Sequence, residues 1–183
     1  MCMFRDLRAD EIEVRIAQAT AKGVSILLYK DARCDQNILD ETVGAMNWMR
    51  SHTRDNANCI VSIWDEKKSQ WISKEDTGTE SNTEKEKGLA SDSFKRACFN
   101  WGIGRELYTA PFIWIPAAEL DSLYEDERNK GRWKCYDSFE VQKIIIENKR
   151  IVALAIRNLK TGKTCFTYVD KKWDAQRKKD SNG

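Results

Sequence analysis

The sequence predicts an α+β fold in which an antiparallel β-β-β meander is packed by one long helix. Three observations carry this prediction: strand-like segments at 47–54, 58–65 and 69–75, a helical pattern over 84–102, and a second strand-rich region over 137–169. Turn residues separate the first three strands, and connections this short require antiparallel neighbours. A chain of 183 residues with 41% hydrophobic content suits one main hydrophobic core.

The segments before the meander predict a helix, a strand and a second helix. Residues 6–21 place apolar side chains among charges at a spacing that favours an amphipathic helix. The segment VSILLYK (24–30) is short, apolar and partly β-branched, as strands are. We expect the second helix over about 35–43, because Gly44 would stop it there.

The chain changes character after Pro111. One short strand is expected at FIWIP (112–116) and a helical or irregular link at 117–131, before the three strands of 137–169. The final segment, 171–183, has five cations against two acids and predicts a basic, flexible tail. We therefore expect three regions, namely a core at 1–111, a β-rich extension of the same domain at 112–170, and the tail.

Composition excludes little on its own. The formal net charge is only +2 while 33% of the residues are charged, so a basic site has to come from local clustering. The six cysteines form no C-x-x-C pair and His52 is the single histidine, so we expect no zinc site. No apolar run approaches the ~18 residues of a membrane span, and we expect a reduced, cytoplasmic protein without a membrane partner.

The long helix expected over 84–102 has two distinct sides. At about 100° per residue one side carries apolar residues and the other carries charges. The apolar side holds Ala90, Phe94, Ala97, Cys98 and Trp101, the opposite side holds Lys85, Asp92 and Arg96, Lys95 lies at the flank, and Phe99 lies near the exposed line.

Lys95 and Arg96 are adjacent cations on this helix. Held on a packed helix, two such side chains keep the geometry that binding a regularly spaced polyanion requires. The alternative is an ordinary solvated helix face, and the pattern alone does not decide between them.

The glycine-containing motifs predict turns. Gly102-Ile103-Gly104 follows the helix and lacks the third glycine of a dinucleotide-binding motif, so it indicates a helix end with close backbone packing. The segment TGKT (161–164) lacks the first glycine and the strand-helix context of a phosphate-binding loop, and it predicts a hairpin turn.

The segment EKEKGLASDSFKRACFNWGIGRELYTAP (84–111) resembles the signature helix of the Rad-fifty-two superfamily of single-strand annealing proteins, in the compact form carried by many bacteriophages. With the upstream order of elements and the segment ETVGAMNW (41–48), the resemblance covers about residues 5–111. It implies a β-β-β-α core whose protomers assemble into rings or helical arcs around single-stranded DNA.

The activity implied by the resemblance is annealing of complementary strands in recombination and repair, without ATP or any other cofactor and without enzymatic chemistry. DNA would run through a positively charged groove with its bases outward. A phage exonuclease or a single-strand-binding protein is a candidate partner, and the host cytoplasm is the implied location.

The family's paired cations match Lys95 and Arg96, while a third family cation falls on Phe99 here. Another basic residue, ahead of the second helix, corresponds to Arg33 or its neighbour Cys34, and we take Arg33. The remaining candidates for nucleic-acid contact are Arg50 and Arg54, which alternation would place on one strand face with Trp48 and His52, and Lys67, Lys68 and Arg105.

Two other functions remain open at this point. Glu66-Lys67-Lys68 matches the E-x-K fragment of metal-dependent nucleases, with Asp40 or Asp65 as a partner carboxylate, although it lies at an expected hairpin turn. A purely structural or adaptor oligomer could instead use the acidic stretch 119–127 as a docking surface.

Overall fold

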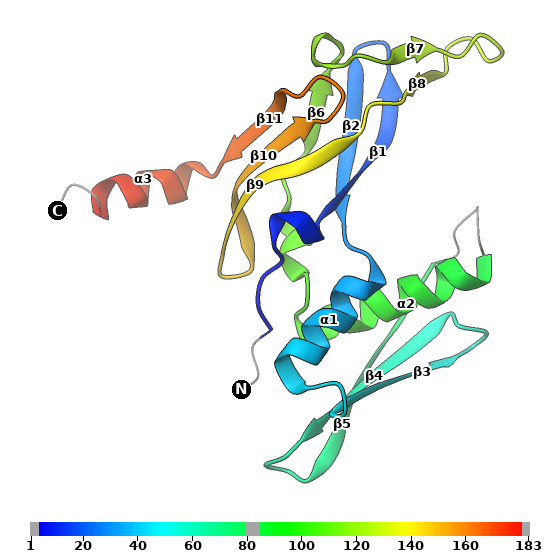
Figure 1. Cartoon of the computed structure of the whole chain (residues 1–183), viewed down its shortest axis with the longest axis vertical. Coiled ribbons are helices and arrows are strands. Elements are labelled where there is room, and N and C mark those ends of the chain that lie inside the picture. Colours follow the sequence, from blue (N-terminus) through cyan, green and yellow to red (C-terminus); the bar gives the residue numbers. More distant parts are fainter. Residues whose placement is uncertain (1–3, 80–84, 181–183) are drawn as a thin grey trace. The chain divides into compact units, whose positions relative to one another are not determined.

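The computed structural model describes residues 4–79 and 85–180, with side chains in the second range from Gly88 onward. Within these ranges the fold is α+β, with three α-helices and eleven strands that pair antiparallel, which confirms the α+β part of the predicted fold class (Figure 1). The chain divides into two compact units. Unit 1 combines Met1–Leu7 with Lys30–Arg105, and unit 2 combines Arg8–Tyr29 with Glu106–Gly183.

The sheet of unit 1 is formed by β3 (Trp48–Thr53), β4 (Asn58–Asp65) and β5 (Gln70–Thr77), in the order β3-β4-β5. These strands lie where the sequence predicts them. Most of the expected connection over 76–83 lies outside the described residues, since β5 runs to Thr77 and the description ends at residue 79.

Helix α1 (Ala32–Val43) has its expected end and starts slightly earlier than predicted. Asp31 caps its N-terminus, where the carboxylate accepts a hydrogen bond from the backbone N–H of Cys34 at 2.8 Å. Gly44 follows its last turn with φ +86°, a conformation that suits glycine. One face of the helix, which includes Ile38 and Leu39, is buried.

Helix α2 (Lys85–Trp101) lies against β4 and β5 (Figure 1). Its apolar side faces the sheet. Phe94, Ala97 and Cys98 are completely buried. The ring of Trp48 on β3 stacks on Phe94 with centroids 6.1 Å apart, and the indole N–H of Trp101 donates to the Val61 carbonyl at 3.1 Å. The side chain of Lys85, which the sequence places on the charged side of this helix, is not among the side chains that the structure describes.

Unit 2 contains two three-stranded sheets, a hairpin and a helix. One sheet has the order β1-β2-β6 and the other β11-β10-β9. The elements are β1 (Glu13–Thr20), β2 (Gly23–Tyr29), β6 (Ile113–Pro116), the hairpin of β7 (Leu123–Glu125) and β8 (Trp133–Cys135), β9 (Phe139–Glu147), β10 (Arg150–Asn158), β11 (Thr164–Val169) and α3 (Lys171–Asp180), with short 3-10 helices η1 (Ala9–Glu11) and η3 (Ala117–Glu119). A third 3-10 helix, η2 (Arg105–Thr109), begins at the last residue of unit 1 and continues into unit 2.

The helix predicted over 6–21 is wrong, because the second half of this segment is strand β1 and only Ala9–Glu11 forms a short 3-10 helix. Val14 and Ile16 are half-buried and alternate with the exposed residues Glu13 and Arg15, which is the two-residue period of a strand. A tight turn joins β1 to β2 at Gly23, whose φ is +147° and where an added Cβ would lie 2.2 Å from the Ile115 carbonyl oxygen. Pairing with β2 therefore overrides the helical spacing.

Two segments of unit 2 are more regular than expected. Where the sequence predicts a flexible tail, residues 171–180 form α3, which begins where the Asp170 carboxylate accepts hydrogen bonds from the backbone N–H groups of Lys172 and Trp173. The predicted helical or irregular link 117–131 contains η3 and also β7, which pairs with β8. The expected core, 1–111, includes β1 and β2, which belong to unit 2.

Candidate nucleic-acid interface

All eight cations that the sequence singles out belong to unit 1. They fall on α2, on the meander and its turns, and at the ends of the two helices. What separates them is the partner that each side chain already has.

Arg96 is held on α2 next to the edge of β5. Its side chain is 41% exposed, and its Nε lies 3.4 Å from an Asp76 carboxylate oxygen. The Asn100 amide also approaches Asp76, at 3.5 Å. Exposed pairs of this kind contribute about 0.2–1 kcal/mol, so the guanidinium is oriented by Asp76 but remains open to a competing anion.

Lys95 is half-buried and lies on the side of α2 that faces α1. It is one of the charges that act on Asp35 of α1, and no hydrogen bond or ion pair joins its ammonium to another residue that the structure describes. Because successive residues project about 100° apart around a helix, Lys95 points toward α1 and Arg96 toward β5. The two cations therefore flank the outer side of α2.

Arg50 and His52 share one face of β3 with Trp48, as alternation predicts. The Arg50 guanidinium is exposed and lies 4.7 Å from the centre of the Phe94 ring, a cation–π contact. Burial lowers the pKa of His52, and the Arg50 charge lowers it further. The His52 ring lies 3.4 Å from the Ser93 hydroxyl, which gives it a packing role against α2.

Lys74 is a cation of this surface that the sequence interpretation missed. Strand pairing places Arg50, Val61 and Lys74 in one row across the meander, on the face that α2 covers. The Lys74 ammonium lies 4.6 Å from the Trp101 ring and donates to the Asn100 carbonyl at 2.7 Å. Alternation along β5, from Ile72 to Lys74, was the signal that could have found it.

The expected place of Arg54 on the strand face with Arg50 is wrong. Strand β3 ends at Thr53, and Arg54 has φ +54° in the turn to β4. Lys67 and Lys68 lie in the exposed turn between β4 and β5, where the Lys68 ammonium is 3.7 Å from Asp65. The adjoining Glu66 accepts a hydrogen bond from the Trp64 indole at 2.9 Å.

Arg33 and Arg105 are engaged at helix ends. Arg33 is 86% exposed and its Nε lies 2.9 Å from Asp31, the residue that caps α1. Arg105 donates to the carbonyl oxygens of Phe99 and Asn100, at 2.6 and 3.0 Å, and so satisfies carbonyl groups at the end of α2. Both side chains therefore have structural partners.

The end of α2 is built as the glycines predict. The N–H groups of Gly102 and Ile103 donate to the carbonyls of Phe99 and Cys98, the pairing of a Schellman motif, and Gly102 has φ +98°. Gly104 has φ +72°, and an added Cβ would lie 2.4 Å from the Lys30 side chain. Backbone and lysine are therefore packed in direct contact.

Lys30 supplies a cation over the ring of Phe99. It is 2% exposed, its ammonium lies 4.8 Å from the Phe99 ring centre, and it pairs with the buried Asp35 carboxylate at 2.5 Å. Burial raises the pKa of Asp35 to about 6, although the Lys30 charge opposes the shift. Phe99 thus occupies the position where the resemblance expects a third cation, and Lys30, from the segment before α1, places an ammonium group over its ring.

No protein-family model, curated protein or solved structure matches this chain. Within residues 4–79 and 85–180, no helix is long and apolar enough to cross a membrane. The same ranges contain no group of three or more His, Cys, Asp or Glu side chains placed to hold a metal ion. Around α2 the cations of Lys30, Arg50 and Lys74 lie over the rings of Phe99, Phe94 and Trp101 respectively.

Proposed function

We propose that this chain binds single-stranded DNA and anneals complementary strands without ATP, as an oligomer of identical subunits in recombination or repair. The observation that carries the proposal is the pair Lys95 and Arg96, both partly exposed at the flanks of α2 while Phe94 and Trp101 anchor the same helix on the meander. These cations stand at the positions where the sequence resembles the Rad-fifty-two superfamily. We take β3, β4, β5 and α2 to be its β-β-β-α core.

The role of the anchored helix is to fix the spacing of its cations. Phe94 is completely buried and stacks on Trp48, so α2 cannot rotate on the sheet without losing that contact. A cation on a fixed backbone loses less freedom when a phosphate binds than one on a flexible segment does. Phosphate contacts position the strand without reading its sequence, as annealing of any complementary pair requires.

Annealing needs no covalent step, so the residues act through charge. Each phosphate neutralised by a cation releases counterions, and the logarithm of the binding constant falls by about 0.7 per contact for each tenfold rise in salt. Arg96 exchanges Asp76 for a phosphate, and Lys95 adds a second contact on the other side of α2. The few contacts of one subunit bind weakly, and repetition along an oligomer multiplies them through effective concentration.

The double variant Lys95→Glu/Arg96→Glu tests the proposal. We expect it to lose binding to a fluorescent single-stranded oligonucleotide and to lose ATP-free annealing of complementary oligonucleotides. Its melting temperature should fall only slightly, because each exchange places a carboxylate near Asp35 or Asp76 but neither cation is buried, and its assembly in electron micrographs should stay close to that of the wild type.

The matched control is Lys130→Glu/Arg132→Glu, an equal change of net charge at two exposed residues between β7 and β8. It should bind nearly as tightly as the wild type. Normal binding by a folded Lys95→Glu/Arg96→Glu protein would contradict the proposal, and equal losses in both double variants would reduce it to non-specific attraction.

A further inference from the structure

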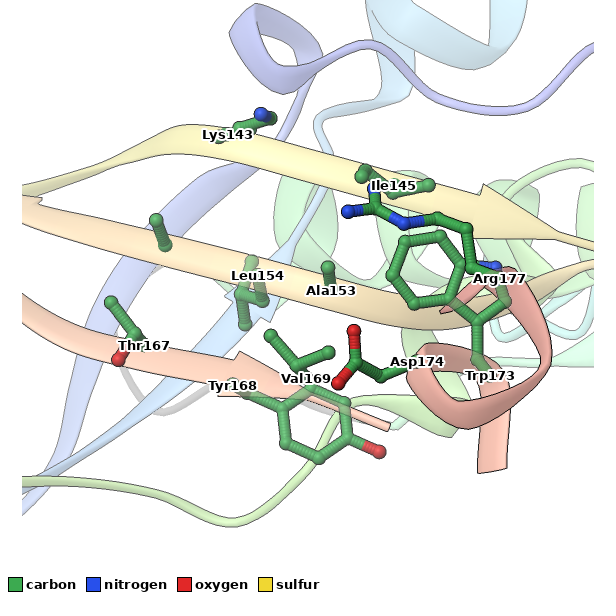
Figure 2. Close-up of a pocket in the computed structure, with 11 residues that line it drawn as sticks. Lys143, Ile145, Ala153, Leu154, Thr167, Tyr168, Val169, Trp173, Asp174 and Arg177 are labelled. Carbon is green, nitrogen blue, oxygen red and sulfur yellow. The ribbon is translucent and has the colours of Figure 1, made fainter. Parts of the chain in front are cut away.

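Unit 2 contains a pocket of about 240 Å³ between the sheet β11-β10-β9 and helix α3 (Figure 2). Strand pairing explains the hollow. Ala153 of β10 lies between Ile145 of β9 and Val169 of β11, and Ala155 lies in the same way between Lys143 and Thr167. Small side chains on the central strand and longer ones on its neighbours leave an apolar floor with raised sides.

Helix α3 closes one end of this pocket. It contributes Trp173, Asp174 and Arg177, which Figure 2 shows grouped beside Ile145 and Ala153. Trp173 is half-buried, and the Arg177 guanidinium lies 5.1 Å from its ring centre. Asp174 is joined to Lys178 by an ion pair of 2.7 Å. The aromatic ring and both signs of charge are therefore held at one end of an apolar floor.

The lining selects the chemistry of a ligand. The volume lies below the roughly 300–1,000 Å³ of pockets for drug-sized ligands, so it suits one ring system. Trp173 and the alanine floor offer apolar surface to such a ring, and Lys143 and Arg177 attract an anionic group attached to it. The carboxylate of Asp174 can accept a hydrogen bond from an amino group on the ring.

We propose that this pocket holds one unpaired nucleobase of a bound single strand, with the adjoining phosphates near Lys143 and Arg177. A peptide with an acidic and an aliphatic residue is the competing occupant. The half-buried ring of Trp173 favours the nucleobase, because a flat base can stack on it and an aliphatic side chain cannot. This inference rests on the proposed single-strand binding and adds a base contact to it.

Two variants remove the pocket in different ways. Ala155→Leu fills the floor of the pocket. Trp173→Ala removes its aromatic wall, and because Trp173 lies on α3 at the edge of the unit, this change should disturb the folding of the sheet less. Ala175→Leu, an equal enlargement on the exposed side of α3, is the matched control. Circular dichroism melts establish that each variant is folded.

Two probes separate base contact from phosphate contact: an oligodeoxycytidine and an abasic deoxyribose-phosphate strand of the same length. The wild type and Ala175→Leu should prefer the oligodeoxycytidine. Each pocket variant should bind it about 10-fold more weakly, because stacking one base on an aromatic residue contributes about 1–3 kcal/mol. Affinity for the abasic strand and the salt dependence should not change.

The outcomes are distinct for the two proposals. A wild type that binds neither strand refutes the proposed function and this inference with it. Binding of both strands with the base preference kept in the pocket variants refutes the pocket alone. Equal losses on both strands would show that the substitutions weaken phosphate contacts as much as base contacts, which refutes the base pocket. Binding of a labelled acidic peptide that neither strand displaces would assign the pocket to a protein partner.

Discussion

Asp76 holds Arg96 in competition with any phosphate, so its removal should strengthen DNA binding. The two groups lie 3.4 Å apart, with side chains 41% and 29% exposed. Such a pair contributes about 0.2–1 kcal/mol, and this free energy must be given up when Arg96 turns to a phosphate. A phosphate bound about 6–7 Å from Asp76 is also repelled by about 0.6 kcal/mol in a water-like dielectric.

Together these contributions give about 1 kcal/mol for Asp76→Asn, or about fivefold tighter binding per contacting subunit. The substitution should leave the fold intact, because an asparagine oxygen can still accept the hydrogen bond from the Thr77 N–H that Asp76 accepts at 2.7 Å. Fluorescence anisotropy with a single-stranded oligonucleotide, repeated over a series of salt concentrations, measures both the affinity and its salt dependence.

Glu13→Gln is the matched control, since it makes the same change of net charge at an exposed residue of β1 in unit 2. It should alter affinity by much less than Asp76→Asn. If Asp76→Asn binds no more tightly than this control, or more weakly than the wild type, then Arg96 does not exchange its partner for a phosphate and its place in the site is refuted.

Three further predictions concern the framework and the tail. Gly104→Ala should lower the melting temperature more than Gly102→Ala, because both have positive φ but only Gly104 touches Lys30. Folding raises the pKa of Asp35 from 3.8 to about 6, so the folded protein binds that proton more tightly than the unfolded chain does. As the pH rises from about 4 through 6, the free energy of unfolding of the wild type should therefore fall relative to that of Asp35→Asn, as measured by urea unfolding. A difference between the two proteins that stays constant with pH would contradict this. Removing residues 171–183 takes away five cations and should reduce the salt dependence of DNA binding, whereas an unchanged salt dependence would exclude a role for this segment.

Sequence reasoning located the elements whose signals are local. Periodicity found the buried side of α2 because Phe94, Ala97 and Cys98 recur at helical spacing, and Gly44 and Gly102 marked helix ends through their backbone freedom. It failed at β1, where Val14 and Ile16 fit a helix or a strand equally well. The deciding contact, pairing with β2, lies outside the segment itself.

The candidate site also depends on contacts that the local sequence does not contain. The sequence puts Arg96 first, through its pairing with Lys95 and through the resemblance, whereas Arg33 rests on the resemblance alone and Arg105 is only a further candidate. In the structure Arg105 satisfies carbonyl groups at the end of α2. Arg33 and Arg96 each pair with a partly exposed acid, Asp31 and Asp76, and a phosphate can replace either pair at low cost.

Availability for binding is therefore decided by the partner that each cation already has, and for Arg96 that partner, Asp76, lies 20 residues away in the sequence. Lys74 illustrates the converse. It carries no motif, yet it lies in one cross-strand row with Arg50 because the register of two strand pairings places it there. A basic surface assembled from rows of this kind follows from sheet register, and spacing along the chain could reveal only the part of it that lies on one helix.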